Sequence, residues 1–133
     1  MGNPVKHFQL CAEDVDAMSA FYREVFGWRI EPRRLTSVDA DVGGTYPIIH
    51  AEEGGIGGGI TDRMPEHPGP VLVIEVDDID ATIEQVLRHG GRLRFPASPP
   101  ERMALSVNGD ADVRFGWAEF QDPEGNLVGI IHR

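Results

Sequence analysis

The sequence repeats itself once, at a distance of 64 residues. Matching residues keep this distance without a gap: Asp14 and Asp78, Asp16 and Asp80, Gly27 and Gly91, Pro32 and Pro96. An unbroken register of this length indicates a duplicated structural unit. The 133 residues are enough for one domain with a core but few for two ordinary domains. We therefore predict a single domain, residues 1–133, built from two modules at about 5–61 and about 70–132.

Each copy contains a predicted amphipathic helix with recognisable ends. Asp14 and Asp78 can accept hydrogen bonds from the free amides of a helix start. Gly27 in the first copy and the pair Gly90-Gly91 in the second can end a helix in the left-handed conformation. Apolar residues recur between them at three- and four-residue spacing: Val15, Met18, Tyr22, Val25 and Phe26, then Ile79, Ile83, Val86 and Leu87. We expect these residues, together with Phe21, to pack in the core.

Strand-like segments surround each predicted helix. "KHFQLCA" and "VLVIEV" precede the helices, and apolar segments punctuated by Gly, Pro and Asp follow them. Hairpin turns are predicted near Glu52 to Gly55 and at Asp122 to Gly125, where Pro123 and Gly125 take their favoured turn positions. The segment 95–112, "FPASPPERMALSVNGDAD", is expected to be mostly loop. Each half is thus a strand, a helix and about three further strands, which is an α+β pattern.

Charge and cysteine content exclude several classes of protein. The chain has 12 Lys and Arg against 22 Asp and Glu, a net charge of -10, which disfavours nucleic acid and anionic membrane surfaces as partners. The single cysteine, Cys11, cannot form an intramolecular disulfide. No segment approaches the roughly 18 apolar residues of a membrane span, and the first residues lack a signal-peptide pattern. We expect a cytoplasmic protein without a membrane partner.

The order of these elements resembles the vicinal oxygen chelate superfamily, which includes glyoxalase I, extradiol dioxygenases and bleomycin-resistance proteins. "FYREVFGW" at the end of the first helix and "DPEGN" before the last strand carry the likeness, which covers nearly the whole chain. The resemblance implies two βαβββ modules that form a curved mixed sheet, the cup, with the helices outside. It also implies a homodimer.

In the metal-dependent members of that superfamily, the first and last strands of each module supply one metal ligand each. The resemblance places these four positions at His7, Gly59, Val71 and Gly129, of which only His7 is a metal-binding residue. A catalytic metal generally needs about three protein ligands. We therefore expect no bound metal, no cofactor and no glyoxalase I activity. If a metal were bound, His7 and His50 would be its ligands, completed by a carboxylate near the following turn.

Strand alternation predicts which side chains line the cup. His7, Gln9 and Cys11 share one face of the first strand, and Phe8, Leu10 and Ala12 share the other, which should lie under the helices. The repeat adds equivalent positions on the second module. The predicted ligand-binding residues are His7, Gln9, Cys11, Gly59, Val71, Val73, Glu75, Trp117 and Gly129. The alternative is that His7, Gln9 and Glu75 only satisfy one another or contact water.

Three further residues have two possible roles each. Cys11 is expected to be a small buried residue, although a neighbouring imidazole could activate it as a nucleophile. Trp28 is expected in the core or at an interface, and Trp117 faces either the cup or a partner. A cup-lining His7 should titrate near its ordinary pKa of about 6.5 unless Glu75 raises it.

The glycine run "GGIGGGI" is not expected to bind phosphate, because no helix follows it. It predicts a thin wall of the cup or a bent edge strand.

Two functions remain open from the sequence. The first is binding of a small, hydrophobic or aromatic molecule in the cup without a catalytic metal. The alternative is a metal-dependent lyase, isomerase or dioxygenase with a reduced ligand set around His7 and His50. No catalytic residue can be assigned from the sequence.

Overall fold

The computed structural model describes residues 2–32, 34–37, 44–63, 69–106 and 113–133. The first module contains β1 (Val5–Ala12), α1 (Val15–Phe26), β2 (Ile30–Glu31), β3 (Arg34–Ser37), β4 (Gly44–Thr45), β5 (Ile48–Ile49) and β6 (Gly57–Asp62). The second contains β7 (Val71–Glu75), α2 (Ile79–Arg88), β8 (Arg92–Ser106), β9 (Val113–Gln121) and β10 (Leu127–His132).

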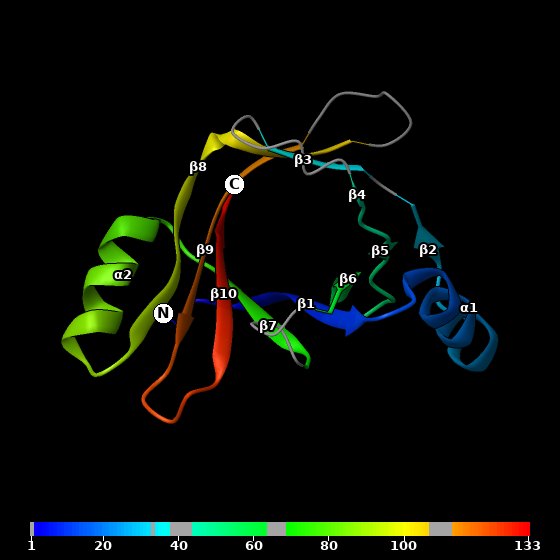
Figure 1. Ribbon diagram of the computed structural model, residues 1–133, viewed down its shortest axis with the longest axis horizontal. Helices are drawn as coiled ribbons and strands as arrows, with labels where there is room; N and C mark the ends of the chain where they lie inside the picture. Colours follow the sequence, from blue (N-terminus) through cyan, green and yellow to red (C-terminus); the bar gives the residue numbers. More distant parts are fainter. Residues whose placement is uncertain (1, 33, 38–43, 64–68, 107–112) are drawn as a thin grey trace.

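All these strands join one mixed sheet in the order β2-β5-β6-β1-β7-β10-β9-β8-β3-β4. The sheet curves strongly, and α1 and α2 lie on its outer side at opposite ends of the molecule (Figure 1). This confirms the predicted α+β class, with two modules forming a curved mixed sheet and helices outside.

The short strands of the first module belong to one long hairpin. The pairs Ile30 with Ile49 and Leu35 with Gly44 keep a single antiparallel register, although they belong to separate strand pairs, β2 with β5 and β3 with β4. The outer part of this hairpin, β3, pairs with β8 of the second module. The hairpin therefore reaches from one module to the other and bridges the two ends of the curved sheet (Figure 1).

The two modules meet through β1 and β7, which pair antiparallel. Phe8 lies directly opposite Leu72, and these residues are 64 positions apart. His7 pairs with Val73, and Gln9 pairs with Val71. Because Val71 is 64 positions after His7 and Val73 is 64 positions after Gln9, the repeat turns each of these pairs into the other. The sequence repeat therefore appears in the sheet as a local twofold relation centred between Phe8 and Leu72.

Both helices begin as the sequence predicts. The side chain of Asp14 accepts a hydrogen bond from the amide of Ala17 at 2.9 Å, and that of Asp78 accepts one from the amide of Ala81 at 3.0 Å. Gly27 ends α1 in the left-handed conformation, with φ of 68°. These contacts satisfy amides that a helix start would otherwise leave without partners.

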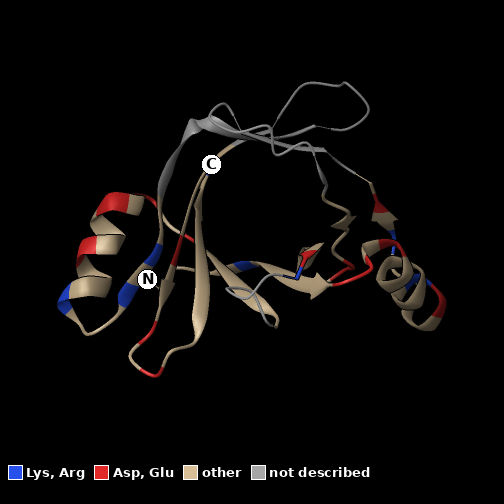
Figure 2. Cartoon of the chain, viewed as in Figure 1, with Lys and Arg blue, Asp and Glu red and all other residues tan. Residues whose placement is uncertain are grey.

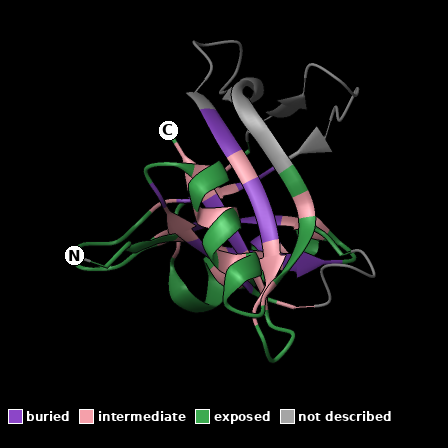
Figure 3. Cartoon of the chain, turned by 90° about the vertical axis from the view of Figure 1, so that its left-hand side faces the viewer, coloured by how far each residue is buried: buried purple, intermediate pink, exposed green. Residues whose placement is uncertain are grey.

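Each helix packs its apolar side on the convex face of the sheet. Under α1 the buried residues are Ala12, Ile30, Ile49 and Ile60, packed against Phe8, Leu10, Val15, Met18, Tyr22 and Trp28. Under α2 they are Val76, Ala118 and Ile130, packed against Ile74, Ile79, Ile83 and Phe120. Figure 3 shows the exposed outer face of α2 in front of these strands. Phe8, Leu10 and Ala12 thus lie under α1, as strand alternation predicts.

The prediction of core positions was wrong for four residues in the second halves of the helices. Phe21 and Phe26 are 54% and 60% exposed, and Val25 and Leu87 are also exposed. Helical spacing marks an apolar stripe, but packing on the sheet is supplied by Val15, Met18 and Tyr22 and does not extend to the last turn of α1. Phe26 instead stacks against Tyr22 and Trp28 at the helix end.

The prediction that residues 95–112 are mostly loop was also wrong as far as Ser106, since β8 is continuous from Arg92 to Ser106. Residues 107–112 lie outside the described part of the chain. The register of β8 against β9 shifts three times between Leu93 and Met103. Prolines are compatible with a strand at such irregularities because ladder hydrogen bonds are already interrupted there.

The two predicted hairpin turns are confirmed. The amide of Gly55 donates to the carbonyl of Glu52 at 2.9 Å, and the amide of Gly125 donates to that of Asp122 at 2.9 Å. Acidic side chains are distributed over both helices and the last turn (Figure 2). Neither helix in the described residues has the length and apolar character that a membrane crossing requires.

Candidate functional site

Several side chains on the concave face of the sheet are buried. Val71 and Val73 of β7 are 1% and 0% exposed, although they lie on the side away from the helices. Directly opposite them on β1 are Gln9, which is buried, and His7, which is half-buried. The structure therefore brings four of the predicted residues into direct cross-strand contact.

A tyrosine that the sequence analysis missed connects His7 with Gln9. The Tyr46 hydroxyl lies 3.0 Å from His7 Nε2 and donates to Gln9 Oε1 at 3.2 Å. Tyr46 itself is buried. His7 and Gln9 are thus satisfied in part through Tyr46, and this hydrogen-bonded group is buried among apolar residues.

The Tyr46 ring lies against Gly59, one of the four positions that the resemblance assigned to metal ligands. A Cβ atom at Gly59 would overlap the Tyr46 ring. Gly59 is opposite Ile48 in the sheet, and Tyr46 stands two residues before Ile48. The ring therefore fills the space that a larger side chain at position 59 would need.

The second module repeats this arrangement with another aromatic residue. A Cβ atom at Gly129 would lie 2.7 Å from the Trp117 ring. Gly129 is opposite Glu119, and Trp117 stands two residues before Glu119. Tyr46 with Gly59 and Trp117 with Gly129 are thus equivalent pairs in the two modules. The register of the two hairpins could have revealed Tyr46 from the sequence.

These side chains do not fit a divalent metal ion. Val71 is aliphatic, Gly59 and Gly129 have no side chain, and aromatic rings stand where carboxylates from these strands would project. Within the described ranges, no group of three or more His, Cys, Asp or Glu is placed to hold a metal. Catalytic metal sites generally need about three such ligands.

His50, the other histidine considered as a ligand, has a different neighbour from His7. His50 Nε2 lies 3.1 Å from the carboxylate of Glu31 on β2. The contact is close but is not aligned as a hydrogen bond, since His50 Nε2 has no hydrogen-bond partner among the described residues. His7 Nε2 contacts Tyr46 instead.

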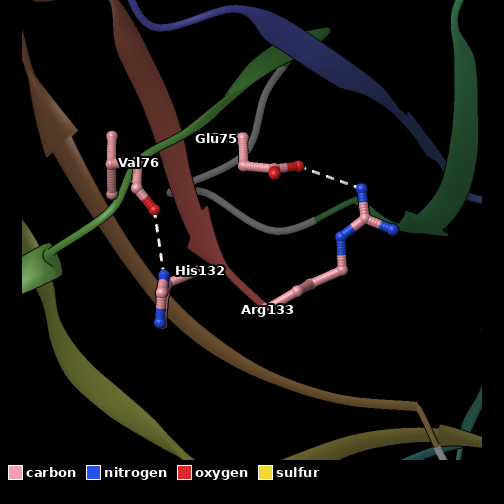
Figure 4. Close-up of polar contacts among 4 residues, drawn as sticks. All are labelled: Glu75, Val76, His132 and Arg133. Carbon is pink, nitrogen blue, oxygen red and sulfur yellow. Dashed lines mark hydrogen bonds and ion pairs between the residues drawn. The ribbon is translucent and has the colours of Figure 1, made fainter.

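Burial keeps His7 neutral. Loss of solvent, and secondarily the charge of Arg133, lower the pKa of His7 to about 4. The expectation of a pKa near 6.5 was therefore wrong, because the interior is less hydrated than an open cup. Glu75 is not among the causes of this pKa shift, and its carboxylate accepts a hydrogen bond from Arg133 at 3.0 Å (Figure 4).

Cys11 is a protonated thiol. Its sulfur donates to the carbonyl of Gly69 at 3.2 Å. Burial and, more weakly, Glu119 raise the pKa of Cys11, against an opposing effect of Arg63. A thiol with a raised pKa is a poor nucleophile, which agrees with a small buried residue.

Glu119 is a second interior residue that the sequence analysis did not assign to the site. It is 1% exposed and lies on β9, opposite Gly129. Burial is the main cause that raises the pKa of Tyr46; the Cys11 thiolate, once it forms at high pH, and the Glu119 carboxylate raise it further, so Glu119 and Tyr46 lie in the same interior. The sequence offered one indication of this position, since Glu119 stands two residues after Trp117 and therefore shares its face of β9.

Comparisons with known proteins agree with this architecture. Residues 5–130 match the model of the Glyoxalase/Bleomycin resistance protein/Dioxygenase superfamily. A glyoxylase-like domain-containing protein of Didymella fabae is 29% identical over 93 residues, which cover 66% of this chain and 69% of that protein.

Two solved structures show the same fold. A hypothetical protein from Bacillus halodurans C-125 superposes with a TM-score of 0.67 at 14% identity, covering 100% of this chain and 96% of the other. A methylmalonyl-CoA epimerase variant from Streptomyces coelicolor superposes with a TM-score of 0.59 at 16% identity, covering 98% and 96%. At such identities the likeness concerns the fold. The family match over nearly the whole chain shows that this protein belongs to the glyoxalase/bleomycin resistance protein/dioxygenase superfamily.

Proposed function

We propose that this protein binds a small, uncharged, apolar or aromatic molecule on the concave face of its sheet, and that it does so without a catalytic metal. One observation carries the proposal: an aromatic ring stands over the glycine at the ligand position of the last strand in both modules. These rings supply apolar surface where metal-dependent relatives would need carboxylates. A flat apolar ligand is the class that such rings recognise.

The polar groups of the interior support the same function. His7, Gln9 and Tyr46 form a hydrogen-bonded group between buried valines. Burying polar groups is costly unless they are paired, and a few convergent polar groups in an apolar surrounding are typical of small-molecule sites. The alternative of a lyase, isomerase or dioxygenase with a metal on His7 and His50 has no third ligand in the described residues.

The test uses the two tryptophans of the chain. In a Trp28→Phe variant, Trp117 is the remaining tryptophan, so a saturable change of its fluorescence reports binding at the concave face. We expect toluene and benzamide to produce such a change. We also expect that Ni²⁺, Zn²⁺ or Mn²⁺ is removed by desalting. Retention of about one metal per chain, lost in His7→Gln, would contradict the proposal.

A further inference from the structure

The hydrogen bonds around Tyr46 determine where the proton of His7 lies. The Tyr46 hydroxyl has one proton, which it donates to Gln9 Oε1. Its contact with His7 Nε2 at 3.0 Å must therefore be a hydrogen bond in which the imidazole donates. Neutral His7 carries its proton on Nε2, and Nδ1 is left with a lone pair.

Two polar atoms of this group have no hydrogen-bond partner within the part of the chain that the structure describes. Among the hydrogen bonds of the described residues, none involves His7 Nδ1 or the side-chain nitrogen of Gln9. In the described chain, His50 Nε2 is the side-chain polar atom that is both fully buried and unpaired. His7 Nδ1 and the Gln9 side-chain nitrogen are unpaired but are not fully buried. Both atoms therefore reach space that a ligand or water can enter. One of them accepts a hydrogen bond and the other donates.

Neither of these atoms carries a charge at neutral pH. His7 is neutral because burial lowers its pKa to about 4, and the side chain of Gln9 is an amide. A carboxylate has acceptors but no donor, so it would leave the lone pair of Nδ1 unpaired in a poorly hydrated site. An unpaired buried polar group is costly.

Two buried valines lie beside this group, while the charges near it belong to Arg133, which donates to Glu75, and to Glu119. Val73 faces His7 and Val71 faces Gln9, and both valines are fully buried. Gly129 lies beside Val73 on the neighbouring strand β10, and the Trp117 ring lies over this glycine. An apolar or aromatic group therefore suits the space next to the donor and acceptor.

We infer that the ligand carries an uncharged group with a hydrogen-bond donor beside an acceptor, as in a carboxamide or a lactam, on an apolar or aromatic body. The donor of the ligand binds His7 Nδ1, and its carbonyl accepts from the Gln9 amide. This inference rests on the proposed function, because it assigns a ligand class to the same site.

Benzamide, methyl benzoate and benzoate test the inference, since they share a ring and differ in donor and charge. Calorimetric titration at pH 7 should show benzamide binding about tenfold more tightly than either ester or acid, the scale of one hydrogen bond. His7→Leu should remove this preference and leave toluene binding in place. His89→Leu, at the exposed end of α2, is the matched control and should keep it.

Nitrogen NMR of the wild-type imidazole gives a reading that does not depend on a variant. His7 should show the Nε2-protonated tautomer, and benzamide should shift its Nδ1 signal. Protonated Nδ1, or equal affinity for benzamide and benzoate while toluene still binds, would overturn the inference alone. If toluene, benzamide and benzoate all fail to bind, the proposed function itself is contradicted.

Discussion

At the scale of single residues, the two glycines under aromatic rings define the character of the interior. Gly59→Ala and Gly129→Ala would each force a methyl group against a ring of Tyr46 or Trp117. We expect each change to lower the free energy of unfolding by about 1–3 kcal/mol, as overpacking does. Urea denaturation measures this.

Gly69→Ala is the control for both variants, because a Cβ there meets no atom of the described residues within 4 Å. Its free energy of unfolding should stay within about 0.5 kcal/mol of the wild type. If Gly59→Ala and Gly129→Ala are as stable as this control, the rings do not occupy the glycine positions.

His7 gives a prediction about pH. Its folded pKa of about 4 lies below the ordinary value, so the unfolded chain binds the proton more readily. The contribution of His7 to stability is complete above about pH 6.5 and is lost as the pH falls towards 4, by up to about 3 kcal/mol. Denaturation at pH 7 and pH 4.5 should show a larger difference in the wild type than in His7→Gln. Equal differences would contradict this account.

The sequence predicted the face of β1 but not the environment of its residues. Alternation predicted that His7 and Gln9 lie on one face of β1 and that Phe8 and Leu10 lie on the other. The structure agrees, because side chains along a strand alternate between its two faces. Strand alternation could not reveal Tyr46, because its contact with His7 crosses 39 residues of sequence; only the register of the β5–β6 hairpin, with Ile48 opposite Gly59, points to it. The low pKa of His7 likewise depends on burial by distant elements.

At the scale of elements, the helix starts are the most local feature of the fold. Asp14→Ala and Asp78→Ala each remove an acceptor from a helix amide. We expect each variant to lose about 1 kcal/mol of stability, and the asparagine variants to retain most of it, since asparagine caps helices nearly as well. Thermal or urea unfolding measures both, and unchanged stability in either alanine variant would show that its cap contributes nothing.

Elements that depend on distant pairing were predicted less well. The caps and the turns at Gly55 and Gly125 follow from a few adjacent residues, and the structure has them. β8 instead owes its length to pairing with β9 and with β3 of the other module. Its prolines pointed to a loop because local sequence does not contain those partners.

At the scale of the whole molecule, the family resemblance implies a homodimer. The exposed apolar residues Phe21, Val25 and Phe26 on α1 are a surface that a second copy would bury. Sedimentation at micromolar concentration should therefore show twice the 14.6 kDa of the chain. A species of 14.6 kDa alone would contradict the prediction.

The repeat allowed the sequence to predict the overall fold, because both modules obey the same pattern and their central strands pair around Phe8 and Leu72. It did not predict how the interior is filled. Equivalent positions carry Tyr46 in one module and Trp117 in the other, and these rings meet their glycines only after the hairpins form.

The central claim is that the concave face binds an uncharged small molecule and needs no metal to do so. Calorimetric titration of benzamide, with and without excess EDTA, tests it most directly. We predict saturable binding of about one benzamide per chain, with the same affinity in both conditions, because the binding groups are His7, Gln9 and apolar side chains. Binding that EDTA abolishes and added Zn²⁺ or Ni²⁺ restores would contradict it.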